Sequence, residues 1–416
     1  MRYALAPLVI ATLLAACAAP STRTGSASGQ LSPFYTWQQA LPEQPGVMLR
    51  TEPQPAQPEF TAAGEMQRIL YTSDDARWGE GILPVSGTLY LPKGAPPAGG
   101  WPLVAWAHGT LGGAGVCAPS WALHKPRDAT YLNRWLEQGF AVVATDYQGL
   151  GGPGPHPYLI WEAEGRSVLD SVRAALAAHP GRIRNDVVIT GQSQGSGSSL
   201  GASRIATEYA PELRIRGTIA TGVVTSFPDG PVTLAAPDPK RGGPIRYTVL
   251  RLIGGSIPED GPSAESLLAE PAKPMLAMAR TACSDALRDF ERANKLDSNN
   301  AFTVSSSELT KLLLPVTDMD QARLPAPIFL GTGLADRTLP PQRQYAAAAA
   351  LCSAGNTVEW KTYPGVTHNG IVNVAFDDEL AFVRRLQAGQ TVQAPCSNLK
   401  DPGPPGQAAT GIPFND

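Results

Sequence analysis

The chain has 416 residues, of which 43% are hydrophobic and 17% are charged. This composition fits a globular protein with a sizeable core and excludes disorder throughout. The formal net charge of −3 at pH 7 gives no basic excess of the kind that binds nucleic acid or an anionic membrane, so we predict no nucleic acid partner.

The first seventeen residues have the form of an export signal. Arg2 precedes an apolar run over residues 4–16 that is too short to cross a bilayer as a helix. The sequence LAAC at residues 14–17 resembles a lipoprotein cleavage site. We therefore predict a bacterial lipoprotein signal, lipidation of Cys17, and export to the outer membrane or cell surface on this membrane anchor. The alternative is a plain secretory signal and free secretion.

Residues 18–59 are predicted to form a tether and an N-terminal arm. Residues 18–32 are rich in Ala, Ser, Thr and Gly, which favours a flexible tether, and residues 33–59 are rich in Pro and Gln. At the other end, residues 397–416 are rich in Pro and Gly and are predicted to be an exposed tail.

Between these segments, short apolar strands alternate with helical stretches. Residues 68–72 and 83–91 indicate two antiparallel strands at the start. Further strands are predicted at residues 103–107, 141–145, 187–190, 218–221, 328–330 and 358–361. Helices are predicted at residues 128–138, 161–178 and 196–209. This alternation predicts an α/β fold whose mostly parallel sheet carries helices on both faces.

The alternation stops at residues 228–325, where helix-like segments at 263–269, 273–294 and 306–314 predict an inserted helical cap. The core then comprises residues 60–227 and 326–396. The apolar cap side chains either line a substrate cavity or pack the cap itself, and packing is the favoured interpretation. These side chains are Leu267, Leu268, Met275, Leu276 and Met278.

The sequence GQSQG at residues 191–195 follows one predicted strand and precedes a predicted helix. A nucleophile elbow requires this order, because its strained serine must project the hydroxyl above the sheet. The positions two before and two after Ser193 must lack side chains, and both are glycine. A GxSxG match alone also occurs in ordinary glycine-rich turns, but the context favours a nucleophile.

A serine nucleophile needs a base, and the base needs an orienting carboxylate. His368 is the only histidine after residue 193 and lies in a turn after the strand predicted at 358–361. Asp336 lies in a glycine-rich turn after the strand predicted at 328–330. The resulting order of Ser193, Asp336 and His368 is that of the α/β-hydrolase fold.

Other acids compete with Asp336 for the orienting role. Asp146 follows the strand predicted at 141–145 and is interpreted as a turn residue. The Asp377-Asp378 pair opens a helical stretch, and Asp377 is interpreted as its cap.

An oxyanion that forms on attack by Ser193 needs backbone donors. The N–H of Gln194, directly after the nucleophile, is one expected donor. The second is expected at Gly109 or Thr110, in the loop after the strand predicted at 103–107, with Thr110 favoured. His108 is interpreted as an orienting or structural residue.

Four cysteines remain besides Cys17, an even number in an exported chain, which predicts two disulfides with three possible connectivities. They are Cys117, Cys283, Cys352 and Cys396. No cysteine or histidine spacing indicates a metal site, so we predict no metal and no other cofactor.

Ser193, Asp336 and His368 resemble the triad of the secretory lipase family of α/β-hydrolases. The resemblance covers about residues 60–396, including the cap between nucleophile and acid. It implies hydrolysis of carboxylic esters, with the cap shaping an acyl pocket.

The same resemblance implies disulfides between Cys117 and Cys283 and between Cys352 and Cys396. The signal that ends at Cys17 departs from the freely secreted fungal members, so we interpret the chain as a bacterial lipoprotein-type member.

We therefore predict a serine carboxylic-ester hydrolase, lipase or esterase, that forms an acyl-enzyme on Ser193 from a small-molecule or lipid ester. A serine peptidase or acyltransferase is the first alternative, with Glu259, Asp260 and Glu265 as the acids that would bind a substrate amine. A noncatalytic binding lipoprotein is the second. The sequence indicates no protein partner, oligomeric state or acyl-chain length.

Overall fold

The computed structural model describes residues 30–79, 81–224, 242–314, 322–392 and 396–415. The signal predicted at residues 1–17, the lipidation site Cys17 and most of the tether lie outside the described residues, as do residues 228–241 and 315–321 of the predicted cap.

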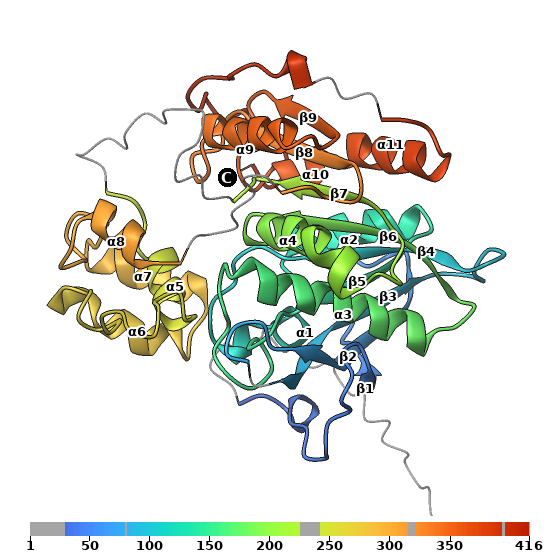
Figure 1. Cartoon of the computed structure of the whole chain (residues 1–416), viewed down its shortest axis with the longest axis horizontal. Helices are drawn as coiled ribbons and strands as arrows, with labels where there is room; N and C mark the ends of the chain where they lie inside the picture. The colour runs from blue at the N-terminus through green and yellow to red at the C-terminus, as the bar shows by residue number, and fades with distance from the viewer. Residues whose placement is uncertain (1–29, 80, 225–241, 315–321, 393–395, 416) are drawn as a thin grey trace, which may run out of the picture.

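One nine-stranded sheet forms the centre of the protein (Figure 1). Its strands are β1 (Met48–Pro53), β2 (Ala63–Asp74), β3 (Ile82–Pro92), β4 (Trp101–Ala107), β5 (Ala141–Thr145), β6 (Ile183–Gln192), β7 (Ile215–Thr221), β8 (Ile328–Gly333) and β9 (Val358–Tyr363). Across the sheet they are ordered β1-β2-β3-β5-β4-β6-β7-β8-β9. Strands β4 to β9 run parallel, and β1, β2 and β3 pair antiparallel with their neighbours. The predicted α/β class with a mostly parallel sheet is confirmed.

Helices cover both faces of this sheet, as predicted (Figure 1). One face carries α3 (Trp161–Ala178), α4 (Gln194–Tyr209) and α9 (Pro341–Ser353). The other carries α2 (Pro126–Glu137), α10 (Ile371–Val374) and α11 (Phe376–Gln387). Every residue of β4 is buried, and its alternate side chains enter the two opposite hydrophobic cores. Because both faces are covered, the central strands are continuously apolar rather than alternating.

The N-terminal arm predicted over residues 33–59 contains regular secondary structure. It contains a 3-10 turn, η1 (Pro33–Tyr35), and strand β1, which pairs with β2. Arg50 donates a hydrogen bond to the carbonyl of Pro33 at 3.0 Å and so links the two. Strand β1 is half exposed at the edge of the sheet and lacks an apolar run, which explains why its sequence gives no strand signal.

The cap contains α5 (Arg246–Ile253), the 3-10 turn η3 (Glu270–Ala272), α6 (Pro274–Ala279), α7 (Ser284–Ala293) and α8 (Ser306–Leu312). It lies beside the sheet domain, on the left of Figure 1. Its helices surround a hydrophobic core of their own. All five apolar side chains singled out from the sequence belong to this core or pack against it, which supports the packing interpretation.

Two helix predictions in the cap are wrong. The helix predicted at 273–294 is broken into α6 and α7, because Cys283 adopts an extended backbone, pairs with Gly112 and is tied to Cys117. The helix predicted at 263–269 forms turns instead, since Leu268 makes a β-bridge to Phe302.

Both disulfides have the connectivity that the family resemblance implies. Cys117, in the short turn η2 (Gly115–Cys117) before helix α1 (Pro119–Ala122), is bonded to Cys283 at the start of α7. This bond joins the core to the cap. Cys352, in α9, is bonded to Cys396 in η4 (Cys396–Asn398) and joins the core to the C-terminal segment.

The C-terminal segment is exposed along much of its length but is attached to the core, unlike a free tail. The N–H of Gly406 donates to the carbonyl of Leu334 at 2.8 Å, and the N–H of Ala409 donates to that of Gly365 at 2.8 Å. Leu334 and Gly365 lie in the loops that carry Asp336 and His368, so the segment covers those two loops.

We expect Glu379 on α11 to make the stability of the fold depend on pH. It is buried, accepts a hydrogen bond from the Tyr131 hydroxyl at 2.7 Å, and its burial raises its pKa to about 8. As the pH rises from the ordinary pKa of a glutamate towards this raised value, the unfolded chain loses the proton before the folded protein does. The free energy of unfolding therefore falls over this pH range. Glu379→Gln has no titrating carboxyl, so we expect its free energy of unfolding to fall less between pH 5 and pH 8 than that of the wild type. The difference should be roughly 1.4 kcal/mol for each unit by which folding raises the pKa of Glu379 within this range.

Urea denaturation at pH 5 and pH 8 measures this effect. The matched control is Asp378→Asn, because the pKa of Asp378 is lowered and its titration falls below this window. Equal pH dependence in wild type and Glu379→Gln would contradict the assignment.

Candidate active site

Ser193 occupies the sharp turn between β6 and α4. Its backbone has φ 57° and ψ −123°, a left-handed conformation that non-glycine residues rarely adopt. A Cβ at Gly191 would collide with the carbonyl of Gly195, and a Cβ at Gly195 would collide with that of Ala107. Only glycine therefore fits these two positions, which is the requirement that the sequence pattern predicts.

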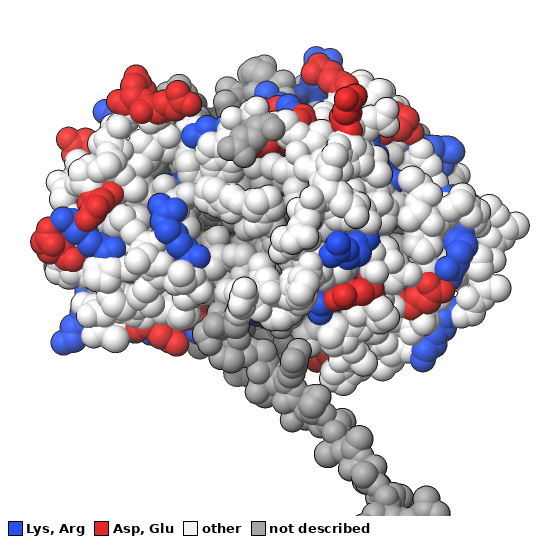
Figure 2. Space-filling model, turned by 90° about the horizontal axis from the view of Figure 1, so that it is seen from below, with Lys and Arg blue, Asp and Glu red and all other residues white. Residues whose placement is uncertain are grey.

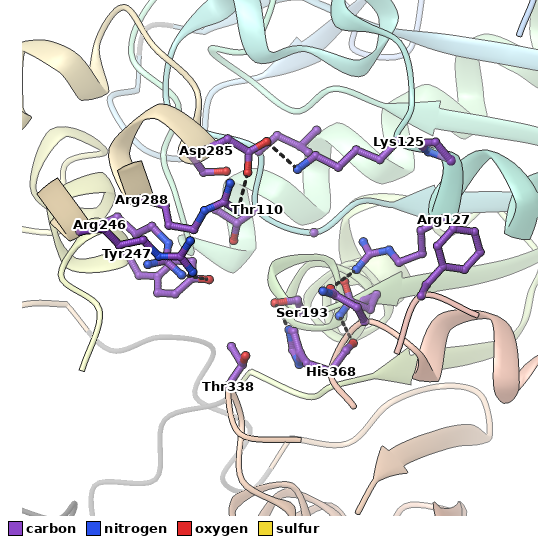
Figure 3. A pocket seen from close by; sticks show the side chains of 18 residues that line it. Thr110, Lys125, Arg127, Ser193, Arg246, Tyr247, Asp285, Arg288, Thr338 and His368 are labelled. Carbon is purple, nitrogen blue, oxygen red and sulfur yellow. Dashed lines mark hydrogen bonds and ion pairs between the residues drawn. The ribbon is translucent and has the colours of Figure 1, made fainter. Parts of the chain in front are cut away.

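Three loops bring Ser193, His368 and Asp336 together. His368 Nε2 lies 2.9 Å from Ser193 Oγ, and His368 Nδ1 lies 2.8 Å from Asp336 Oδ2. The loops follow β6, β8 and β9, whose parallel carboxyl ends meet at one edge of the sheet. Figure 3 shows Ser193 and His368 facing each other at the edge of a cleft.

Asp336 is fully buried and held from several sides. Its Oδ1 accepts the N–H groups of Thr338 and Leu339, each at 2.8 Å. Its Oδ2 accepts the Gln344 side-chain amide at 3.0 Å in addition to His368. An ionised Asp336 makes Nδ1 of His368 the donor and leaves Nε2 as an acceptor for the Ser193 hydroxyl.

Gln192 and Gly222 both lie against the loop that carries His368. The Gln192 side-chain amide donates to the carbonyl of His368 at 3.0 Å. A Cβ at Gly222 would lie 2.8 Å from His368 Cε1, so this glycine leaves room for the imidazole ring.

Asn415 holds the same loop from the C-terminal segment. Its Oδ1 accepts the N–H of Thr367 at 2.7 Å, and its Nδ2 donates to the carbonyls of Gly365 at 2.9 Å and Ala409 at 2.8 Å. No motif in the Pro- and Gly-rich tail connects Asn415 with the histidine loop.

The competing acids have other partners. Asp146 is buried and accepts hydrogen bonds from the Ser86 hydroxyl, at 2.5 Å, and from the backbone and hydroxyl of Ser120. It therefore joins β3 to α1, a structural role. Asp377 lies inside the first turn of α11, whose N-cap is Ala375, so the cap prediction is wrong; Asp377 pairs with Arg134 at 2.6 Å.

The two predicted groups of oxyanion donors flank Ser193. Gln194 begins α4, where the first N–H groups of a helix have no partner within the helix. Gly109 and Thr110 line the cleft beside Ser193, and the Thr110 hydroxyl is engaged by Tyr158 at 2.7 Å. His108 is buried, which lowers its pKa, and its Nδ1 donates to the carbonyl of Gly109 at 2.7 Å. These contacts give His108 a structural role.

A buried network beneath the elbow holds the Gln194 side chain. Its amide Nε2 lies 2.7 Å from both Glu164 Oε1 and His156 Nε2, and the Ser198 hydroxyl donates to Glu164 Oε2 at 2.5 Å. Burial raises the pKa of Glu164 to about 7 and lowers that of His156 to about 3. No motif relates these four positions, so the sequence does not predict this network.

Ser193 and His368 open into a cleft of about 610 Å³ between the core and the cap. Its walls carry five cationic side chains and one carboxylate, together with the apolar or aromatic Leu111, Pro126, Tyr247 and Phe414. The charged residues are Lys125, Arg127, Arg246, Arg288, Arg292 and Asp285. None of the five apolar cap side chains named above lines this cleft.

Within the described ranges, no group of three or more His, Cys, Asp or Glu side chains is arranged to hold a metal ion. The helices in those ranges are each too short or too polar to be membrane spans.

A family model of secretory lipases matches residues 120–384. The chain belongs to the secretory lipase family. A secreted triacylglycerol lipase of Malassezia globosa is 25% identical over 283 residues, which cover 64% of this chain and 58% of the relative. Lipase A of Arthroderma benhamiae is 27% identical over 303 residues, 67% of this chain and 62% of the relative. The chain thus spans about three fifths of the length of these two relatives.

Solved structures share the fold. Candida antarctica lipase A has a TM-score of 0.67 at 19% identity, with 88% of each chain covered. The rice cell wall degrading esterase LipA of Xanthomonas oryzae has a TM-score of 0.59 at 18% identity, with 83% of this chain and 97% of that chain covered. The predicted α/β-hydrolase fold is confirmed.

The hydrogen-bond chain predicts that Asp336 controls the reactivity of Ser193. Asp336→Asn preserves the shape of the side chain, but its amide favours the tautomer of His368 that carries the proton on Nε2. In comparable triads this change lowers the rate by about three to four orders of magnitude. We expect a loss of about that size in the rate of labelling of Ser193 by a fluorophosphonate, measured under pseudo-first-order conditions.

Asp377→Asn is the matched control, because it removes a competing acid that contacts Arg134 instead of His368. Equal labelling rates for wild type and Asp336→Asn would exclude the orienting role.

Proposed function

We propose that this secretory lipase family member is a serine carboxylic-ester hydrolase, a lipase or esterase that forms an acyl-enzyme on Ser193. The observation that supports this most is the continuous chain of hydrogen bonds from Asp336 through His368 to Ser193 Oγ, at 2.8 and 2.9 Å, at the edge of a cleft. Its substrate is a small-molecule or lipid ester.

In the proposed acylation step, His368 Nε2 takes the proton of Ser193 as Oγ attacks the ester carbonyl. The negative oxygen of the tetrahedral intermediate accepts hydrogen bonds from the N–H of Gln194 and from the backbone near Gly109 or Thr110, with Thr110 favoured. His368 then gives its proton to the departing alkoxide, and the acyl group stays on Ser193.

Deacylation repeats these steps with water. His368 Nε2 removes a proton from the water as its oxygen attacks the acyl carbonyl, and the same N–H groups stabilise the second oxyanion. Collapse of the intermediate returns the proton to Ser193 Oγ and releases the carboxylic acid. Asp336 stays ionised throughout and stabilises the imidazolium that forms in each half.

The alternatives have less support. The acids that a peptidase would use to bind a substrate amine, Glu259, Asp260 and Glu265, are exposed and do not line the cleft. The cationic lining of the cleft would also repel an ammonium group. A noncatalytic binding role does not account for the complete triad geometry.

Hydrolysis of 4-nitrophenyl esters from acetate to palmitate tests the proposal. We expect turnover by the wild type, and a loss of several orders of magnitude in Ser193→Ala, because removing the nucleophile eliminates the acyl-enzyme route. The profile over chain length distinguishes an esterase from a lipase. A folded wild type that hydrolyses none of the esters would exclude the ester assignment.

We further propose export as a lipoprotein, with Cys17 as the lipidated residue and its acyl chains as the membrane anchor; free secretion is the alternative. The cleavage-site sequence at residues 14–17 and the two disulfides, which persist in oxidising compartments, support this. Anchoring at an outer membrane or cell surface would present the esterase to external substrates.

Replacing Cys17 tests the anchor. In a bacterial host that lipidates exported proteins, we expect the wild type to partition into the detergent phase of Triton X-114 and Cys17→Ser to stay in the aqueous phase, since lipid chains supply the apolar surface. Aqueous partitioning of the wild type, with its signal cleaved, would favour free secretion.

A further inference from the structure

The cleft beside Ser193 is cationic, although the protein as a whole is not. Five cationic side chains line it: Lys125, Arg127, Arg246, Arg288 and Arg292. The whole chain has a net charge of −3. On the face shown in Figure 2, acidic and basic side chains are scattered among broad uncharged areas. The concentration of cations next to the proposed nucleophile is therefore local.

These cations come from two separate parts of the molecule. Lys125 and Arg127 lie at the start of α2, in the core. Arg246 begins α5, and Arg288 and Arg292 lie on α7, both in the cap. Figure 3 shows Arg246 and Arg288 on one side of the cleft and Arg127 on the other. Since Arg288 and Arg292 are four residues apart on a helix, they share one face of α7.

Carboxylates within reach compensate only part of this charge. Asp285 forms ion pairs with two cations, Lys125 at 3.1 Å and Arg288 at 2.9 Å. Although burial alone would raise the pKa of Asp285, these two cations outweigh it and hold that pKa below its ordinary value. Arg288 also lies 3.7 Å from Asp289, whose side chain is 70% exposed.

Arg127 and Arg246 are each paired with a carboxylate of the protein. Arg127 pairs with Asp128 at 2.7 Å and donates to the Asn369 side chain at 2.7 Å. Arg246 pairs with Glu291 at 2.6 Å.

Arg292 differs from both: its side chain is exposed and forms no ion pair with any described residue. Positive charge is therefore left over on the cap wall at Arg292, one helical turn from Arg288, which shares Asp285 with Lys125.

Such a wall fits poorly against a purely apolar chain, because covering guanidinium groups without a partner costs free energy. Guanidinium groups instead match carboxylate and phosphate oxygens, which they bind through paired hydrogen bonds. The apolar cap side chains that would suit a long acyl chain are turned into the cap core.

We propose that this site prefers esters that carry an anionic group away from the scissile bond, bound by Arg288 and Arg292 while the carbonyl lies at Ser193. This rests on the proposed ester hydrolysis and names its substrate class. The anionic group has two chemical sources, a free carboxylate at the far end of an acyl chain or the phosphate of a phospholipid.

Matched ester pairs test the preference. The first pair is the mono-4-nitrophenyl ester of octanedioic acid, with its free carboxylate, against 4-nitrophenyl octanoate. The second is dihexanoyl phosphatidic acid against dihexanoylglycerol, both below their aggregation concentrations. The measured quantity is the ratio of kcat/KM for the charged ester to that for the neutral ester, so changes common to both substrates cancel.

We expect a ratio of about ten or more for wild type in at least one pair, and a loss of about tenfold to a hundredfold in Arg288→Gln/Arg292→Gln, as for hydrogen bonds to charged groups. Arg292→Glu should lower the ratio at least as far, since it adds repulsion. Raising the salt concentration should reduce the wild-type preference, because the guanidinium groups are partly exposed. The pair that shows the preference identifies the source of the anion.

Arg280→Gln is the matched control, an exposed arginine of the same cap outside the cleft lining, and should keep the wild-type ratio. A ratio near one in both pairs, or a ratio that Arg288→Gln/Arg292→Gln leaves unchanged, overturns the anionic preference but not ester hydrolysis. Hydrolysis of neither the neutral nor the charged esters overturns the proposed function and this inference with it.

Discussion

The strained turn at Ser193 is the constraint on which the rest of the site depends. A non-glycine residue in this conformation costs on the order of 1–3 kcal/mol and persists only where the surroundings enforce it. Here the enforcement is steric and local to the sheet, since Gly191, Gly195 and the Ala107 carbonyl are in contact at the ends of β6 and β4. The buried central strands supply the rigidity that keeps the serine hydroxyl above the sheet edge.

Around this turn, the polar groups of the site are held by hydrogen bonds rather than by packing alone. Asp336 accepts hydrogen bonds from backbone N–H groups and from a side-chain amide, and the carbonyl of His368 accepts one from the Gln192 side chain. Asn415 adds a third support, from a segment almost fifty residues farther along the chain. Each loop is thereby oriented independently of substrate, as preorganised catalysis requires.

The residues of the cap have two separate roles. Its apolar side chains form a core of their own, and its helix α7 presents charged side chains to the cleft. The Cys117–Cys283 disulfide joins the start of α7 to the core domain near the same cleft. It therefore ties the charged wall of the cap to the domain that carries the proposed nucleophile, which favours a defined distance between the two.

The sequence by itself determined the α/β class, the elbow and the order of Ser193, Asp336 and His368, because strand, turn and helix signals are local and parallel strands end at one edge. The tertiary structure alone decided the break between α6 and α7, the return of Asn415 to the histidine loop and the convergence of Lys125 with Arg288 and Arg292. Each of these depends on contacts between segments distant along the chain. Such contacts leave no periodicity or motif in the residues that make them.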